Sequence, residues 1–390
     1  MHSLERNPVK KIDWLTIILV LGLVAFGLVS LSSIMATPLS GTEQSITDYI
    51  DKLNMEYITR QAQNFLIAAA ACIVVTLFDY EIFKTFAPWT YLFVLLLLLL
   101  LFAVGVIRGG TQGWFVSEAI ERAFQPSELT KVALIVLLSR VVSSAMDKDG
   151  RIKRFKDIAL CVAITAVPFA LIWLQPDAGS AFVCVVILIV LLFVGRVSWK
   201  LIIPVGIGLA GLVVVAYFFL MEDYQVSRIQ DFFTALVDPS MLEEDSDVWL
   251  ALTAIGSGQM WGKGFFSTAT LAQLRWIRAR HTDYIFAGIS EGVGFVGGTI
   301  LILVYLVLAI RWIYLSIKAR DTFGSCLIMG CVAMLIAHVF ENIGMNIGLM
   351  PVTGIPLPFI SYGGSNLLTN MIAVGIVLNV GLRRPMKKTR

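Results

Sequence analysis

The chain has 390 residues, of which 58% are hydrophobic and only 15% are charged, with a mean hydropathy of +0.83 and a net charge of +3. A soluble protein of this length would carry far more charge on its surface, so these values exclude an ordinary water-soluble enzyme. They predict an integral membrane protein.

Apolar runs predict an all-α polytopic bundle of about ten transmembrane helices, forming a single domain over residues 1–390. A helix needs roughly 20 residues to cross ~30 Å of hydrocarbon. Five runs reach or exceed this length: 14–35, 87–107, 201–221, 285–310 and 359–382. Shorter or interrupted runs complete the set: 65–78, 127–145, 158–174, 180–194 and 323–345. The first run is too long for the apolar core of a signal peptide, and we expect it to be a span.

Lysine and arginine residues in the loops predict the orientation. With ten spans and a cytoplasmic N-terminus, the basic loop at 148–156 and the basic tail at 383–390 both fall on the cytoplasmic side. The opposite side receives the acidic stretch 222–247 and the long loop 222–282, between spans seven and eight. That loop is too long to be a mere connector, so we expect it to carry function.

Cysteine and histidine usage argues against a metal centre built on these residues. All five cysteines lie within apolar runs, where they act as small core residues without disulfide or metal spacing. The three histidines are scattered. We expect no required cofactor, while a divalent cation such as Mg²⁺ held by acidic residues stays open.

Ionisable residues at membrane depth mark candidate sites, because each is costly unless it is paired. Glu128 and Lys131 begin the fourth span on one face of a helix, either as a self-satisfied ion pair or as part of a substrate cavity. Asp177, in the turn before the sixth span, suits an N-cap, a cavity-lining role, or both. Asp283 precedes the eighth span and allows an N-cap or a functional carboxylate. Glu291 lies too far along the helix to form a close carboxylate pair with it.

Two glycine clusters are candidate anion sites. The segment 256–264 lacks the spacing of a nucleotide-binding loop, but its backbone amides and Lys263 are suited to an anion. The segment 361–365, which begins with Ser361, has the same character. Either cluster can equally serve close helix packing.

Six strings occur along the chain in order: FQPSELTK at 124–131, QPDAGS at 175–180, AIGSG at 254–258, GKG at 262–264, RHTDYIFA at 280–287 and PVTGIPLPFISYGGS at 351–365. In residues and order they resemble the SEDS family, over about residues 14–382. RHTD combined with PVTGIPLP is more similar to the RodA-type elongation branch than to the FtsW-type division branch.

The resemblance implies a peptidoglycan glycosyltransferase that polymerises lipid II into glycan strands at the outer face of the bacterial cytoplasmic (inner) membrane. It also implies a class B penicillin-binding protein as transpeptidase partner and further membrane proteins of the elongation complex, with no nucleic acid. By position, the family's essential aspartate is Asp283, and its intramembrane acid and base are Glu128 and Lys131.

The chemistry expected of such an enzyme suits these residues. Joining an α-linked donor through a β bond is an inversion, which a single displacement with one carboxylate base delivers, and we assign that base to Asp283. Cations would stabilise the diphosphate leaving group, first Arg280 and Lys263, then Arg228 with residues 275 and 278. His281, Ser361, Asp177, Glu128 and Lys131 complete the predicted substrate-binding set.

Two alternatives stay open: a flippase for lipid-linked precursors, and an inactive scaffold that recruits a transpeptidase. The scaffold is favoured by departures from the family pattern. Gly113 stands where the family usually has Arg, and Gly292 replaces the second of two acids. Residues 267–279 replace the Gly-Thr-Gln and Leu-Pro-Glu elements that the family has between the GKG and RHTD strings. The long outer loop ending at Asp283 favours the enzyme over the flippase.

Overall fold

The computed structural model describes residues 12–37, 52–108, 111–117, 122–198, 200, 203–204, 207–208, 211, 223–238, 241–243, 246–267, 270–273 and 277–385. Seven of the helices in these ranges are long and apolar enough to cross a membrane: α1 (Trp14–Ile34), α3 (Met55–Leu77), α4 (Tyr80–Val104), α6 (Phe155–Trp173), α11 (Ile285–Ile317), α12 (Thr322–Asn346) and α13 (Gly364–Leu382). Two more helices lie in the same bundle, α5 (Pro126–Ala145) and α7 (Ala178–Val194).

The predicted fold class is confirmed, and the ends of several spans need correction. The second helix begins at Met55 and the third at Tyr80, well before the predicted starts at 65 and 87. Their first turns are too polar for an apolar-run search to find. The last helix begins at Gly364 because 359–363 form a turn. The predicted span at 201–221 and the basic N-terminal residues lie largely outside the described residues.

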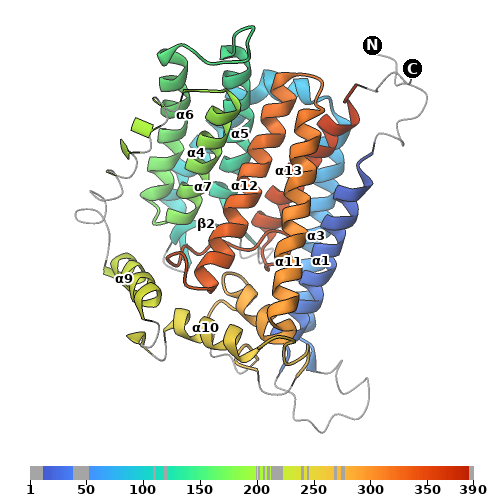
Figure 1. The fold of residues 1–390 in the computed structure, drawn as a ribbon, viewed down its shortest axis with the longest axis vertical. Helices are drawn as coiled ribbons and strands as arrows, with labels where there is room; N and C mark the ends of the chain where they lie inside the picture. The colour runs from blue at the N-terminus through green and yellow to red at the C-terminus, as the bar shows by residue number, and fades with distance from the viewer. Residues whose placement is uncertain are drawn as a thin grey trace.

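Helices α12 and α13 form the centre of the bundle, whereas α3, α4 and α6 expose most of their apolar residues at its periphery (Figure 1). The segment between α4 and α5 is a small antiparallel sheet of three strands in the order β1 (Val106–Arg108), β2 (Thr111–Ser117) and β3 (Arg122–Phe124). The predicted loop 222–282 carries α9 (Asp223–Val237) and α10 (Asp247–Ser257) at one end of the bundle (Figure 1).

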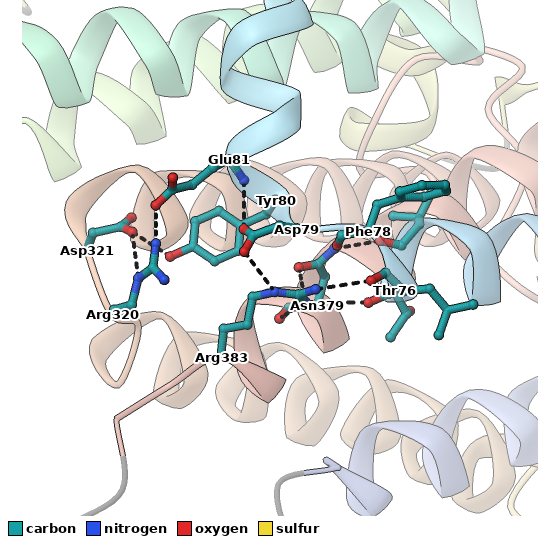
Figure 2. Close-up of polar contacts among 11 residues, drawn as sticks. Thr76, Phe78, Asp79, Tyr80, Glu81, Arg320, Asp321, Asn379 and Arg383 are labelled. Atoms are coloured by element: carbon teal, nitrogen blue, oxygen red, sulfur yellow. Dashed lines mark hydrogen bonds and ion pairs between the residues drawn. The ribbon is translucent and has the colours of Figure 1, made fainter. Parts of the chain in front are cut away.

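At the opposite end, a polar cluster joins three chain segments (Figure 2). Arg320, between α11 and α12, pairs with Glu81 of α4. Arg383, at the end of α13, lies 3.5 Å from Asp79 in the turn between α3 and α4. The Tyr80 hydroxyl donates to Asp321. These contacts hold the ends of α3, α4, α12 and α13 in register.

The eighth predicted span is broken inside α11, and the break receives the long loop. Gly294 has a left-handed backbone (φ 68°) that interrupts the helix. The freed backbone groups bond to the segment 259–264: Phe295 N–H donates to Gln259 O at 2.8 Å, and Lys263 N–H donates to Glu291 O at 2.9 Å. The kink therefore pins the GKG string against α11.

We predict that Gly294→Ala destabilises the protein. A Cβ at this position would lie 2.3 Å from Gly262 N, and the alanine would have to keep the positive φ of the glycine. The free energy of unfolding should therefore fall by more than ~1 kcal/mol. Thermal unfolding in detergent measures the effect. The matched control is Gly22→Ala in α1, where no described heavy atom lies within 4 Å and alanine favours the helix. Equal melting temperatures for the two variants would contradict the assignment of the kink.

Candidate active site at the start of helix α11

Asp283 lies in the turn that leads into α11, and two amide side chains of α12 hold its backbone. Asn342 Nδ2 donates to the Asp283 carbonyl at 2.8 Å, and Asn346 Nδ2 donates to it at 3.0 Å. Asn346 Oδ1 in turn accepts from Ala287 N–H at 3.0 Å, in the first turn of α11. Both asparagines are fully buried. The position of Asp283 is therefore set by a helix that follows it in the chain.

The glycine-rich turn before α13 holds the residues on the other side of Asp283. Ser361 Oγ donates to Thr282 O at 2.6 Å, and Tyr362 N–H donates to His281 O at 2.9 Å. Gln61 of α3 donates to Ser361 O at 3.0 Å. Ser361 therefore positions the segment that carries Asp283, and its hydroxyl is already engaged by that backbone.

The Asp283 side chain is not an N-cap. Tyr284 is the N-cap residue of α11 and makes no side-chain capping bond, while Asn346 satisfies the amide of Ala287. The capping interpretation therefore does not hold in the structure.

The surroundings of Asp283 favour a carboxyl that titrates near neutral pH. Burial raises the pKa of Asp283 to about 6, while the positive charge of Arg228 and a hydrogen bond from Thr282 oppose that rise. Asp177 and Asp247 raise the pKa further through their negative charge. A carboxylate in this range accepts a proton more readily than an ordinary aspartate.

Asp177 both caps a helix and joins two helices. Its Oδ1 accepts from Ser180 N–H at 3.1 Å, at the start of α7. Its Oδ2 accepts from Ser127 Oγ and Gln125 Nε2, each at 3.0 Å, at the start of α5. The negative charge of this junction also reaches Asp283.

Glu128 and Lys131 form a buried pair that extends to α12. Lys131 Nζ lies 2.8 Å from Glu128 Oε1 and 2.9 Å from His338 Nε2. An ammonium can only donate, so the His338 Nε2 is the acceptor and the ring carries its proton on Nδ1. All three residues are almost completely buried, as is Glu341 one turn along α12. The predicted pairing is confirmed, and its third member comes from another helix.

Lys263 lies apart from this group and pairs with Glu291 at 2.7 Å. Glu291 is fully buried and also accepts from the backbone N–H groups of Leu271 and Ala272, at 2.9 and 3.3 Å. Glu291 therefore anchors the loop to α11. The neighbouring Gly292 leaves room for Phe265, whose ring would lie 3.1 Å from a Cβ at that position. A Cβ here would require the ring to shift slightly.

Arg280 and His281 line a separate pocket of about 390 Å³, together with Tyr57 and Arg278. The His281 ring packs edge-on against Tyr57, with centroids 5.3 Å apart. Burial and the charge of Arg280 lower the pKa of His281, so its imidazole is neutral at pH 7. Arg280 Nε also donates to Ile34 O at 3.4 Å. The predicted cation Arg275 lies outside the described residues.

The charges of Arg228 and Asp177 thus act on the pKa of Asp283, and Ser361 bonds to the backbone of the preceding Thr282. Lys263 is paired with Glu291. Sequence reasoning missed Asn342, Asn346 and His338. Their signal was available, because each is a polar residue inside an apolar span, where such residues tend to be functional or to bond a partner.

Comparison with known proteins identifies the family. The family model for FtsW, RodA and SpoVE, described as cell cycle proteins, matches residues 13–385. The chain belongs to this family. It is a multi-pass membrane protein, as the helices above show.

Members of the FtsW/RodA/SpoVE family resemble the chain over most of its length. The peptidoglycan glycosyltransferase MrdB of Escherichia coli K12 is 34% identical over 306 residues, which cover 78% of this chain and 80% of MrdB. Stage V sporulation protein E of Bacillus subtilis is 33% identical, over 94% of this chain and 96% of that protein.

Two solved structures of this kind share the fold. The crystal structure of the rod shape determining protein RodA of Thermus thermophilus matches with a TM-score of 0.68 and 26% identity, covering 96% of this chain and 98% of that one. A chain from a peptidoglycan synthase complex that coordinates polymerization and crosslinking matches with a TM-score of 0.74 and 26% identity, covering 95% and 97%.

We predict that Glu128 and Lys131 are energetically coupled. Glu128→Gln or Lys131→Met alone leaves the other charge buried without its partner, which costs ~3–5 kcal/mol, whereas the double change costs less than the sum. Thermal unfolding of the parent, the two single variants and the double variant measures the coupling as a double-mutant cycle. The control is the same cycle on the exposed pair Glu56–Arg60 of α3, 3.0 Å apart, where the coupling should stay below ~1 kcal/mol. Additive effects at 128 and 131 would contradict the coupling.

Proposed function

We propose that the protein is a peptidoglycan glycosyltransferase that joins lipid II units into glycan strands, with Asp283 as the general base. One observation carries the proposal: Asp283 is held in place through its backbone carbonyl, so its carboxylate has no structural capping task. The glycosyltransferase name of MrdB and the polymerization activity of the related synthase complex support the reaction class.

The proposed reaction is a single displacement. The acceptor sugar hydroxyl loses its proton to Asp283 and attacks the anomeric carbon of the donor, while the bond from that carbon to the lipid diphosphate breaks. The leaving diphosphate keeps the electron pair, and the configuration at the anomeric carbon inverts. A base with a pKa of about 6 is ionised at neutral pH and still accepts a proton in the transition state.

Arg228 is the cation we place nearest this chemistry, because its charge acts directly on Asp283. Its guanidinium also donates to Val352 O at 3.2 Å, in the PVTG string. Arg280 and His281 would bind substrate from their own pocket. Lys263 would act only after leaving Glu291, so we assign it a supporting role.

We further propose that the protein serves cell elongation beside a class B penicillin-binding protein, within the elongation complex of the bacterial cytoplasmic membrane. The similarity to RodA and MrdB supports the elongation role, and the structure of a complex that couples polymerization to crosslinking supports a transpeptidase partner.

The proposed orientation places both termini in the cytoplasm and the segment 222–282 outside. Cysteine at Met241, which is 73% exposed, should react with an impermeant thiol reagent in intact cells, whereas cysteine at the exposed Lys156 should react only after lysis. The background is low because the five native cysteines are buried. The reverse pattern would overturn the orientation.

Asp283→Asn should abolish polymerisation while leaving the fold intact. Asparagine keeps the shape but cannot accept a proton, and loss of a general base typically costs ~10²–10⁴-fold in rate. The folded-state pKa of Asp283 is raised, so its ionised form costs stability above about pH 6, and the Asn variant should melt no lower than the parent at pH 7.5. Polymerisation of labelled lipid II by purified protein, with and without its partner, gives the rate.

Asp247→Asn is the matched control, because Asp247 is a nearby acid whose pKa is also raised by burial. It should keep most of the activity.

The pH profile gives a second readout. The parent rate should fall about tenfold per pH unit below pH ~6, and Arg228→Gln should move this fall to higher pH because the cation lowers the pKa of Asp283. Robust polymerisation by Asp283→Asn would remove Asp283 from the mechanism. An absence of polymerisation by the parent, with and without its partner, would instead favour a flippase or a scaffold.

A further inference from the structure

A groove of about 1010 Å³ lies at the end of the bundle opposite α9 and α10, where the turn between α5 and α6 meets the end of α7. The walls near the bundle end are basic, formed by Arg151, Lys153, Arg196 and Lys200, and none of the described residues that line the groove is a carboxylate. Within the described residues, no carboxylate lies within 4.0 Å of the cationic groups of Arg151, Arg196 or Lys200. Lys153 is paired with Asp147 at 2.6 Å and with Asp149 at 3.3 Å, so the net charge comes from the other three cations. The groove is therefore a concentration of positive charge.

The rest of the groove is mostly apolar and runs toward the membrane interior. Phe193 and Val194 of α7 and Met329 of α12 line this part, and Ile152, Val197 and Ser198 complete the lining. Met329 lies seven residues into α12, which places it roughly 10 Å along the helix axis from Thr322. Cations at a membrane surface above an apolar slot between two helices match a lipid with an anionic headgroup, because the headgroup and the acyl chains meet complementary surfaces.

Backbone contacts make the basic rim rigid. Ile152 N–H donates to Gly195 O at 3.0 Å, and the Ile152 side chain is buried. A Cβ at Gly195 would lie 2.7 Å from Ile152 Cδ1, so the two turns are in close contact. The two turns carrying Arg151 and Arg196 are thus fixed relative to each other before any ligand binds.

Arg196 occupies a backbone position that normally favours glycine. It follows the C-cap of α7, where Arg196 N–H donates to Phe193 O at 2.9 Å and Val197 N–H donates to Leu192 O at 3.2 Å. This pattern requires a left-handed residue, and Arg196 has φ 47°. An arginine here is strained where glycine would not be, and strained residues of this kind cluster at functional sites.

From these observations we infer that the groove binds an anionic phospholipid, with the phosphate on Arg151, Arg196 and Lys200 and an acyl chain along Phe193 and Met329. The site lies at the end of the bundle opposite Asp283 and is independent of the proposed reaction.

Native mass spectrometry of the full chain in neutral detergent tests the inference, with phosphatidylglycerol titrated against phosphatidylcholine. The parent should retain phosphatidylglycerol selectively. Arg196→Gly removes the cation and relieves the backbone strain, so it should weaken this binding about fivefold while the melting temperature in detergent stays equal or rises. Arg196→Gly combined with Lys200→Gln should weaken it about thirtyfold.

Lys148→Gln combined with Lys156→Gln is the matched control, since it removes the same charge from the same end of the bundle outside the groove. It should weaken binding less than twofold. An equal loss in the control pair would overturn the site in favour of diffuse surface charge. Equal retention of phosphatidylcholine would also overturn it, as would displacement of the lipid by inorganic phosphate at the same concentration, which would indicate a site for free phosphate.

Discussion

Two hydrogen bonds from buried asparagine amides to one carbonyl organise the site end of the molecule. Asn342 and Asn346 lie one turn apart on α12, and both donate to the Asp283 carbonyl. A carbonyl left without a donor in an apolar interior costs on the order of 1–3 kcal/mol, so these amides hold the turn before α11 in one conformation. The position of the Asp283 carboxylate, the proposed base, depends on that conformation.

A second constraint comes from charge buried in the bundle. Lys131 is enclosed between Glu128 of the same helix and His338 of α12. Helices α5 and α12 therefore cannot slide past each other without breaking the hydrogen bond between Lys131 and His338. The Asp177 junction joins the start of α5 to the start of α7 in the same way. These buried contacts give the helices a single register, which apolar packing alone specifies less strictly.

The two ends of the bundle have different chemistry, and each suits its surroundings. At the end with α9 and α10, burial raises the pKa of Asp283, Asp177 and Asp247 raise it further, and the charge of Arg228 opposes the rise. At the opposite end, acids and bases are matched in the cluster of Figure 2. Arg151, Arg196 and Lys200, which no described carboxylate pairs, gather in the groove. The first arrangement suits the proposed proton transfer to Asp283, and the second suits the proposed binding of an anionic lipid.

The sequence alone determined the membrane class, most helices, the family and the Glu128–Lys131 pair. Hydropathy acts over consecutive residues, and an i,i+3 pair shares a helix face, so both can be read locally. Only the tertiary structure decided that Lys131 meets His338, 207 residues away, and that Lys263 pairs with Glu291 rather than lying beside Asp283. Periodicity shows which residues share a face of one helix, but which faces meet depends on how all the helices pack together.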